Sequence, residues 1–391
     1  MIRVAYFGPD IHDAAVPRRV VSLQEDGFHV EGFTMRRGQP LETDWPNTDL
    51  GETRDGAFMQ RLAAVFAGAR LAADSEAFRS CDIIMARNFD MLICAFEAKR
   101  RAGLDTPVIY ECRDIHRLLS RTDAAGVAMR RLERSLLRRC SALMVSSPGF
   151  LTHHYAVHHD GLYDAVLVEN RMSGAMELGD RPSASVRDAA APLRIGWAGK
   201  LRCKRSHRLL AALADRFPSG VEIHAHGIPA LNEIPEFHSE IDKRRNFTFH
   251  GPYTSPDDLA GIYAGMDVVW AGDFMEADGN SDWLLPNRLY EGGYYGTPPI
   301  APDGTETAAW VKDRKCGFTP GEALENTLPA LVERLLNDRR LIDEKEARLL
   351  ALPTSVFVET RGEMAALIEK ALSNHRAGAT SDAADAPTTA A

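Results

Sequence analysis

Short apolar runs alternate along the first part of the chain with longer stretches of helical character. The apolar runs fall at residues 2–7, 28–33, 81–86, 107–110, 141–145 and 165–168. The stretches that we interpret as helices cover residues of about 17–26, 57–79, 90–102 and 124–139. Strand, helix and strand in this order are typical of a parallel sheet covered by helices. We therefore predict a Rossmann-like α/β domain over residues 1–172.

The same alternation restarts in the second half of the chain. Residues 173–192 contain mainly Gly, Pro, Ser, Asp and Ala, and we interpret them as a linker. Strand-like runs follow at 193–197, 221–226, 247–250, 267–271 and 299–301, with predicted helices at 205–216, 256–265, from about 286, and at 323–336. A second Rossmann-like domain is expected over residues 193–352. Ligands of doubly wound sheets bind at the carboxyl ends of the strands, so we expect the functional site in a cleft between two facing domains.

Composition narrows the class of protein. The net charge is −9, whereas a nucleic-acid-binding protein normally has a basic excess, so no nucleic-acid partner is expected. The six cysteines form no C-x-x-C pair, the start MIRVAYFG resembles a strand rather than a signal peptide, and no apolar run approaches about 18 residues. We expect a cytoplasmic protein without a membrane span. Residues 374–391 are rich in Ala, Thr, Ser and Asp, and we expect a disordered tail there.

One segment has the features of a phosphate-binding turn. Residues 195–206 (IGWAGKLRCKRS) lead from a predicted strand into a predicted helix. Gly196 and Gly199 allow the backbone to approach a ligand closely, and Lys200 and Lys204 can reach its phosphates. A basic surface loop is an equally good interpretation of this segment alone. No convincing Asp-x-Asp motif follows a strand, so we predict that no metal ion holds the phosphates.

A second segment is more specific. Residues 285–300 (LPNRLYEGGYYGTPPI) place Pro286 in the first turn of a predicted helix. Asn287 and Arg288 lie beside the helix N-terminus, where a diphosphate would bind. Glu291 lies about one and a half turns further along, and its carboxylate could accept hydrogen bonds from both hydroxyls of a ribose. The alternative for Glu291 is an ordinary surface acid.

Together these segments resemble the retaining GT-B glycosyltransferases, specifically glycosyltransferase family four, over nearly the whole chain. The resemblance implies two Rossmann-like domains facing across a cleft. It also implies that residues 353–373 return to the first domain through an apolar stripe of Phe357, Met364, Leu367 and Ile368. The donor-binding residues that it implies are Gly8, Gly199, Lys200, Lys204, Asn287, Arg288, Leu289 and Glu291.

Two positions depart from the family pattern. The family often has a second Glu seven residues before the ribose-binding acid, at the position where this chain has Trp283; Asp282, Asp278, Glu276 or backbone amides could replace it. In the segment 107–119 (PVIYECRDIHRLL), Arg113 occupies the place of the family's His and Asp114 the place of its acid. We assign Arg113 and Asp114 catalytic roles, with a structural ion pair between them as the alternative.

The resemblance implies transfer of a hexose-type sugar, with retention, from a nucleotide diphosphate sugar to a glycan or lipid-linked glycan acceptor in surface polysaccharide assembly. No cofactor other than this co-substrate is implied. The leaving phosphate takes the acceptor proton in such enzymes, so no protein base is expected. A nucleotide-sugar epimerase of the same fold and a non-catalytic nucleotide-sugar-binding protein are the alternatives.

Three other features have weaker interpretations. His224 and His226 could form a metal pair, but no third ligand is evident and a structural role is favoured. His153, His154, His158 and His159 fall in a segment expected at the surface. The basic helix at 124–139 could rest on anionic lipid at the inner membrane surface; a solvated helix packed on the sheet explains it equally well.

Overall fold

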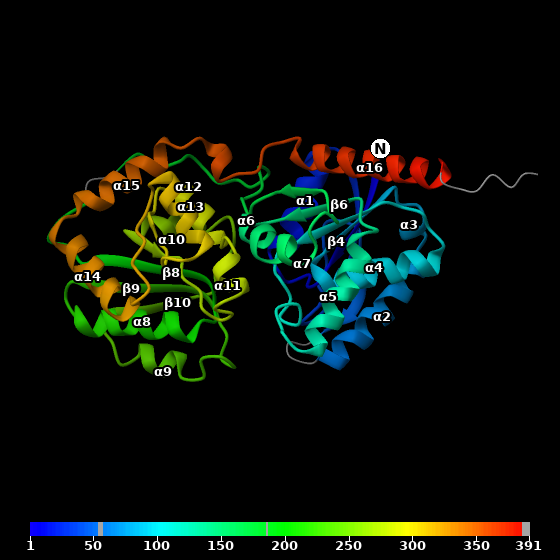
Figure 1. Cartoon of the computed structure of the whole chain (residues 1–391). Coiled ribbons are helices and arrows are strands. Elements are labelled where there is room, and N and C mark those ends of the chain that lie inside the picture. The colour runs from blue at the N-terminus through cyan, green and yellow to red at the C-terminus, as the bar shows by residue number, and fades with distance from the viewer. Residues whose placement is uncertain (54–57, 185–186, 385–391) are drawn as a thin grey trace, which may run out of the picture. The chain divides into compact units, whose positions relative to one another are not determined.

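The computed structural model describes residues 1–53, 58–184 and 187–384 (Figure 1). The chain divides into two compact units. Unit 1 comprises Met1–Glu169, Ser173–Ala175 and Thr360–Ala391, and unit 2 comprises Asn170–Met172 and Met176–Glu359. Each unit is built on one parallel sheet covered by helices.

The sheet of unit 1 has seven parallel strands in the order β3-β2-β1-β4-β5-β6-β7. The strands are β1 (Arg3–Gly8), β2 (His29–Arg36), β3 (Asn47–Glu52), β4 (Ile83–Arg87), β5 (Val108–Cys112), β6 (Ala142–Val145) and β7 (Ala165–Leu167). The strand order reverses between β1 and β4, which are paired with Val4 opposite Ile83. A reversal of this kind opens a crevice at the carboxyl ends of the two strands.

Helices cover the sheet of unit 1. They are α1 (Ala15–Glu25), α2 (Phe58–Asp74), α3 (Glu76–Arg79), α4 (Asn88–Ala102), α5 (Ala124–Leu137), α6 (Pro148–Phe150), the π-helical η1 (Leu151–Tyr155), α7 (Ala156–His158) and α16 (Glu363–Ala384). On one sheet face, Val4 and Tyr6 pack with Val16 of α1 and Leu367 of α16. Phe7, Phe33 and Phe78 form a separate aromatic cluster.

Unit 2 repeats the arrangement with five parallel strands in the order β10-β9-β8-β11-β12. The strands are β8 (Leu193–Leu201), β9 (Val221–Pro229), β10 (Phe247–Gly251), β11 (Val268–Trp270) and β12 (Pro299–Ile300). The helices are α8 (Lys204–Arg216), α9 (Phe237–Ile241), α10 (Leu259–Ala264), α11 (Asn280–Trp283), α12 (Asn287–Tyr294), α13 (Glu306–Arg314), α14 (Leu324–Asn337), α15 (Arg340–Ala351) and the 3-10 turn η2 (Thr354–Val356). The order reverses between β8 and β11, so the crevice of this sheet lies at their carboxyl ends.

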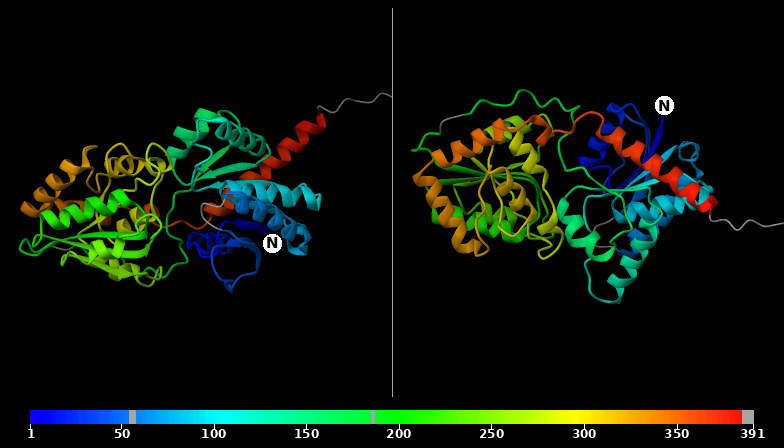
Figure 2. Two further views of the ribbon diagram at one scale, coloured as in Figure 1. Left: turned by 90° about the horizontal axis from the view of Figure 1, so that it is seen from below. Right: turned by 45° about the horizontal axis from the view of Figure 1, so that its top comes forward.

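Helix α16 belongs to unit 1, although unit 2 separates it in sequence from the rest of that unit (Figures 1 and 2). Met364, Leu367, Ile368 and Ala371 are buried in the core of unit 1. The carboxylate of Asp26, just after α1, accepts hydrogen bonds from the backbone amides of Gly362, Met364 and Ala365 at 2.7–3.0 Å. A carboxylate at a helix N-terminus satisfies otherwise unpaired amides, so this contact fixes the start of α16.

The segment expected to return to unit 1, residues 353–373, has other boundaries in the structure. Phe357 packs inside unit 2, where its ring contacts Gly293 and Trp310, and so is not part of the apolar stripe on unit 1. The helix also continues to Ala384, past the boundary expected at residue 373, because Asn374 and His375 bond to Ser141, Asp164 and Asp105 of unit 1. Residues 385–391 of the expected tail lie outside the described residues.

Candidate functional site

The predicted phosphate-binding turn begins later than expected, because β8 continues past residue 197 and Gly199 and Lys200 are still paired with Gly227 and Ile228 of β9, at the strand-order reversal of unit 2. Gly199 has φ +109°, a conformation that glycine adopts without strain. Lys200 is exposed, and its ammonium group has no acidic partner within the described part of the chain. Lys204 begins α8, and its Nζ lies 3.2 Å from Oε1 of Glu236. Since both groups of that pair are exposed, it is weak and a bound anion could replace it.

Helix α12 brings the second motif to the same strand end. Arg288 Nη1 donates a hydrogen bond of 3.2 Å to the carbonyl of Ala198 in β8. Pro286 is the N-cap residue, and Asn287 and Arg288 are half-buried in the first turn. The side chain of Leu289 is fully buried and packs in the core of unit 2. The structure therefore brings Gly199, Lys200 and the start of α12 together within unit 2.

Glu291 is a buried acid rather than a surface acid. Only 3% of the residue is exposed, and Tyr263 donates a hydrogen bond of 3.1 Å to its Oε2 atom. Burial and the neighbouring Glu291 charge raise the pKa of Tyr263, which keeps the phenol protonated as a donor. Gly292 and Gly293 permit this close packing, because a Cβ at Gly293 would stand 2.4 Å from the Phe357 ring. The carboxylate of Glu291 in α12 is therefore oriented by its hydrogen bond to Tyr263 in α10.

The loop after β11 adds residues that sequence reasoning did not single out. Asp273 is buried and forms an ion pair with Arg202, whose Nη2 atom is 3.3 Å from its Oδ2 atom. The carboxylate of Asp282, one of the residues proposed to replace the missing acid, accepts a hydrogen bond of 2.6 Å from the backbone amide of Asp278 in the same loop. Trp283 is the half-buried last residue of α11. The pairing of Arg202 with Asp273 could not be predicted from the sequence, because about 70 residues separate the two.

In unit 1, the carboxyl ends of β1, β4 and β5 carry a buried charged network. Glu111 is fully buried and accepts hydrogen bonds from Arg19 at 3.1 Å and from the Tyr6 hydroxyl at 3.2 Å. Arg87 in turn donates to the Tyr6 hydroxyl at 3.2 Å. Burial acts to raise the pKa of Glu111, but Arg19 and Arg87 outweigh it and lower the pKa. Glu111 is therefore ionised and holds the two arginines in place.

The predicted residues of unit 1 surround this network. Gly8 ends β1, and a Cβ there would lie 3.2–3.3 Å from Thr34 and Val16. Arg113 follows β5, and its backbone amide bonds to Asn88, which has φ +63°. Burial, together with repulsion from Arg87, lowers the pKa of Arg113 to about 10, so it remains cationic at neutral pH. Asp114 is exposed, and within the described residues no ion pair joins it to Arg113. Arg113 is thus a cation at the carboxyl end of β5, within the electrostatic reach of Glu111 and Asp13.

A curated relative is similar over most of the chain. The succinoglycan biosynthesis protein ExoL of Rhizobium meliloti (strain 1021) is 38% identical over 326 residues, which cover 81% of this chain and 81% of the relative. The chain belongs to the ExoL family. No protein-family model matches the sequence.

Solved structures share the fold at low identity. Sucrose-phosphate synthase from Thermosynechococcus elongatus has a TM-score of 0.70 at 15% identity and covers 98% of this chain and 100% of its own. Anabaena Alr3699/HepE in complex with UDP and glucose has a TM-score of 0.67 at 13% identity with the same coverage. WaaG, a glycosyltransferase involved in lipopolysaccharide biosynthesis, has a TM-score of 0.59 at 11% identity, covering 91% of this chain and 97% of its own. The predicted GT-B fold of two Rossmann-like domains is confirmed; membership of family four stays a prediction.

The histidine pair of β9 has a third neighbour. His250 of β10 stacks on His226 with ring centroids 4.2 Å apart, and its Nε2 atom lies 3.0 Å from Nδ1 of His224. The sequence showed no third ligand near this pair; the parallel pairing of β9 with β10 brings His250 to it. Burial and the neighbouring His250 and His224 lower the pKa of His226 to about 4.

Helix α5 uses part of its basic face for internal contacts. Arg130 donates to the carbonyls of Leu119 and Arg121, and Arg134 donates to the carbonyl of His158. Leu132 is 38% exposed. No helix in the described residues is both long and apolar enough to span a bilayer.

The lowered pKa of His226 predicts acid sensitivity of unit 2. An unfolded histidine, with a pKa near 6.5, binds a proton that the folded His226 rejects until about pH 4. Stability should therefore fall as the pH decreases from 7 to 5, by at most about 1.4 kcal/mol for each pH unit. His226→Gln should make this decrease smaller, measured by urea unfolding at both pH values. His238→Gln, at an exposed histidine of the same unit, is the control; an equal effect of both variants would contradict the assignment.

Proposed function

We propose that this chain is a retaining glycosyltransferase that moves a hexose-type sugar from a nucleotide diphosphate sugar to a glycan or lipid-linked glycan acceptor. The observation that carries the proposal is the convergence in unit 2 of the Gly199 turn, Lys200 and the start of α12 beside a buried, oriented Glu291. The relative ExoL is named for succinoglycan biosynthesis, and HepE was crystallised with UDP-glucose. These names support surface polysaccharide assembly and a UDP-sugar donor.

In the proposed reaction, the bond between the anomeric carbon and the donor phosphate breaks, and a bond to an acceptor hydroxyl forms on the same face of the sugar. The acceptor proton passes to the leaving phosphate. Backbone amides after Gly199 and at the start of α12, with Lys200 and Lys204, stabilise the diphosphate as its charge grows. In unit 1, Arg113 and Asp114, on the loop after β5, are the residues to which we assign catalytic roles. No metal ion is required for this step.

Turnover assays test the proposal. The protein should convert UDP-glucose or another nucleotide diphosphate sugar only when a glycan acceptor is present, and added Mg²⁺ or Mn²⁺ should not change the rate. Release of an isomerised free sugar without acceptor would instead indicate an epimerase. Donor binding without any turnover across an acceptor panel would indicate a binding protein.

The proposal includes peripheral contact between α5 and an anionic membrane surface. Arg131, Leu132 and Arg138 are exposed on this helix, and a basic helix with exposed apolar residues adsorbs to anionic lipid. Sedimentation with vesicles should show binding that needs anionic lipid and weakens at high salt. Arg131→Glu should reduce it, and binding equal to that of wild type would remove this part of the proposal.

Lys200 should contribute more to donor binding than Lys204. Lys200→Ala removes a charge-assisted contact and should weaken UDP binding by about 1.5–3 kcal/mol, or roughly 10- to 100-fold. Lys204→Ala should have a smaller effect, because Lys204 must leave Glu236 to bind phosphate. Calorimetric titration with UDP measures both. Arg208→Ala, at an exposed position of the same helix, is the control, and unchanged affinity in both lysine variants would move the phosphate site elsewhere.

Glu291 should determine the preference for ribose. Glu291→Gln keeps the shape of the side chain but removes its charge, so UDP binding should weaken by about 1.5–3 kcal/mol while discrimination against 2′-deoxy-UDP decreases. Tyr263→Phe removes the hydrogen bond that orients the carboxylate and should weaken binding less. Calorimetry with both nucleotides measures the preference. Wild-type protein that binds the two equally would show that Glu291 does not contact ribose.

A further inference from the structure

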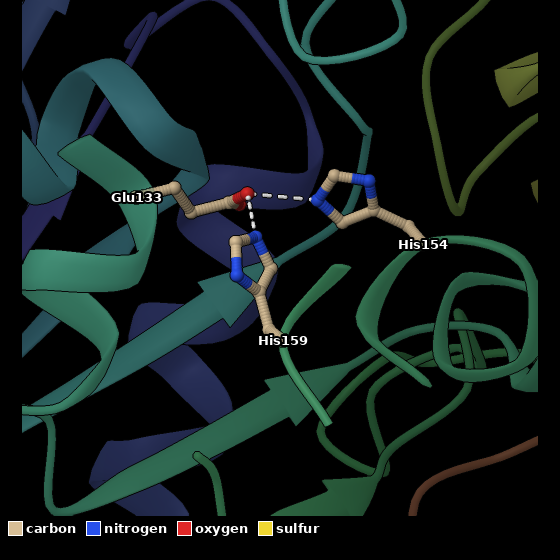
Figure 3. Close-up of side chains that lie close together, drawn as sticks. All are labelled: Glu133, His154 and His159. Atoms are coloured by element: carbon tan, nitrogen blue, oxygen red, sulfur yellow. Dashed lines mark hydrogen bonds and ion pairs between the residues drawn. The ribbon is translucent and has the colours of Figure 1, made fainter. Parts of the chain in front are cut away.

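Three buried side chains with metal-binding atoms converge in unit 1 (Figure 3). Glu133 comes from α5, His154 from η1, and His159 directly follows α7. The Nε2 atoms of both histidines lie 2.8 Å from the same oxygen, Oε2 of Glu133. Their side chains are 1% exposed and that of Glu133 is 0% exposed. The expectation that His154 and His159 lie at the surface was wrong: both are buried, whereas His153 and Asp160 beside them are exposed.

The backbone around the two histidines is irregular in a way that produces this convergence. Residues five positions apart on a regular α-helix point about 140° away from each other. Here the π-helical segment η1 carries His154, and the chain leaves helical geometry at His159, with φ −137°. Single π-helical turns are frequent at functional sites. Both imidazoles consequently reach one carboxylate on another helix.

The polar atoms of the cluster bond mainly to one another. The carboxylate of Glu133 accepts the hydrogen bonds from both histidines and a longer one, of 3.5 Å, from the hydroxyl of Tyr110. Among the described residues, the ion pairs of Glu133 are with these two histidines alone. The Nδ1 atom of His159 is buried without a hydrogen-bond partner there. A buried polar atom without a partner is costly, so hydrogen bonding alone does not satisfy the cluster.

We propose that Glu133, His154 and His159 bind a zinc ion. Two imidazole nitrogens and a carboxylate oxygen are zinc ligands, and at zinc–ligand distances of about 2.0–2.1 Å the ligand atoms of a tetrahedral site stand roughly 3.3 Å apart. The separations of 2.8 Å are those of the hydrogen-bonded, metal-free form. Zinc binding requires each nitrogen to move away by about 0.5 Å and to carry its proton on Nδ1. Tyr110, with its hydroxyl 3.5 Å from Oε1 of Glu133, borders the fourth position.

The zinc ion would act as a structural link. It would join the middle of α5 to the segment that contains η1 and α7, where Arg134 and the carbonyl of His158 already form a hydrogen bond. None of these ligands is among the residues proposed to hold the donor or to act on it. Because a metal that binds only the folded state contributes its binding free energy to stability, removal of zinc should destabilise unit 1 without abolishing UDP binding by unit 2.

Metal analysis and thermal unfolding of the full chain test the proposal. Protein produced with zinc in the medium should retain about one zinc per chain after gel filtration. Chelator-treated protein should gain about 5–10 °C in melting temperature when zinc is restored to 100-fold above its Kd. Four-coordinate cobalt in the same site should give intense visible absorption. Wild-type protein without bound zinc, without this shift and without the cobalt spectrum would overturn the proposal, whatever the variants do.

Matched variants locate the site. Glu133→Gln and His159→Gln should lose the zinc and the zinc-dependent shift, whereas His158→Gln, in the same segment, should keep both. His250→Gln is the control for the second histidine cluster, and loss of zinc in this variant alone would overturn the assignment. If Glu133→Gln lowers the melting temperature equally with and without zinc, while zinc content stays at the wild-type level, the cluster is a hydrogen-bonded network only and the proposal fails.

Discussion

Parallel strand direction is the constraint on which the rest of this molecule depends. When all strands of a sheet run the same way, their carboxyl ends share one edge, and the order reversal leaves room for a ligand there. In unit 2 this places Gly199 beside the start of α12, although about 90 residues separate them in sequence. In unit 1 it gathers Gly8, Arg87 and Arg113. Both groups of proposed site residues therefore follow from the topology of the sheets.

Three buried glutamates show how the protein accommodates charge in its interior. Glu111 is compensated by the permanent charges of Arg19 and Arg87, which gives a rigid network. Glu291 accepts a hydrogen bond from the hydroxyl of Tyr263, which orients its carboxylate. Glu133 accepts hydrogen bonds from two histidines, whose nitrogens we propose as zinc ligands. The three carboxylates thus differ in the side chains that donate hydrogen bonds to them.

The sequence predicted what local patterns encode. Apolar runs identified most of the buried strands, and the segment 285–300 identified the helix that carries Glu291. The edge strand β3 was missed because its sequence, NTDLGE, is polar, as an edge strand with one solvent-facing side can be. Phe357 and the Glu133 cluster were not foreseen because their surroundings come from tertiary contacts. A buried histidine and an exposed one look alike in a single sequence.

The docking of α16 has a consequence for synthesis of the chain. Proteins emerge from the ribosome N-terminus first, and domains usually fold in that order. Here the core of unit 1 lacks Leu367, Ile368 and Ala371 until those residues have left the exit tunnel. All of unit 2 has emerged by then, since it ends at Glu359. The later half of this chain can therefore complete its folding before the earlier half, which remains open to chaperones during most of translation.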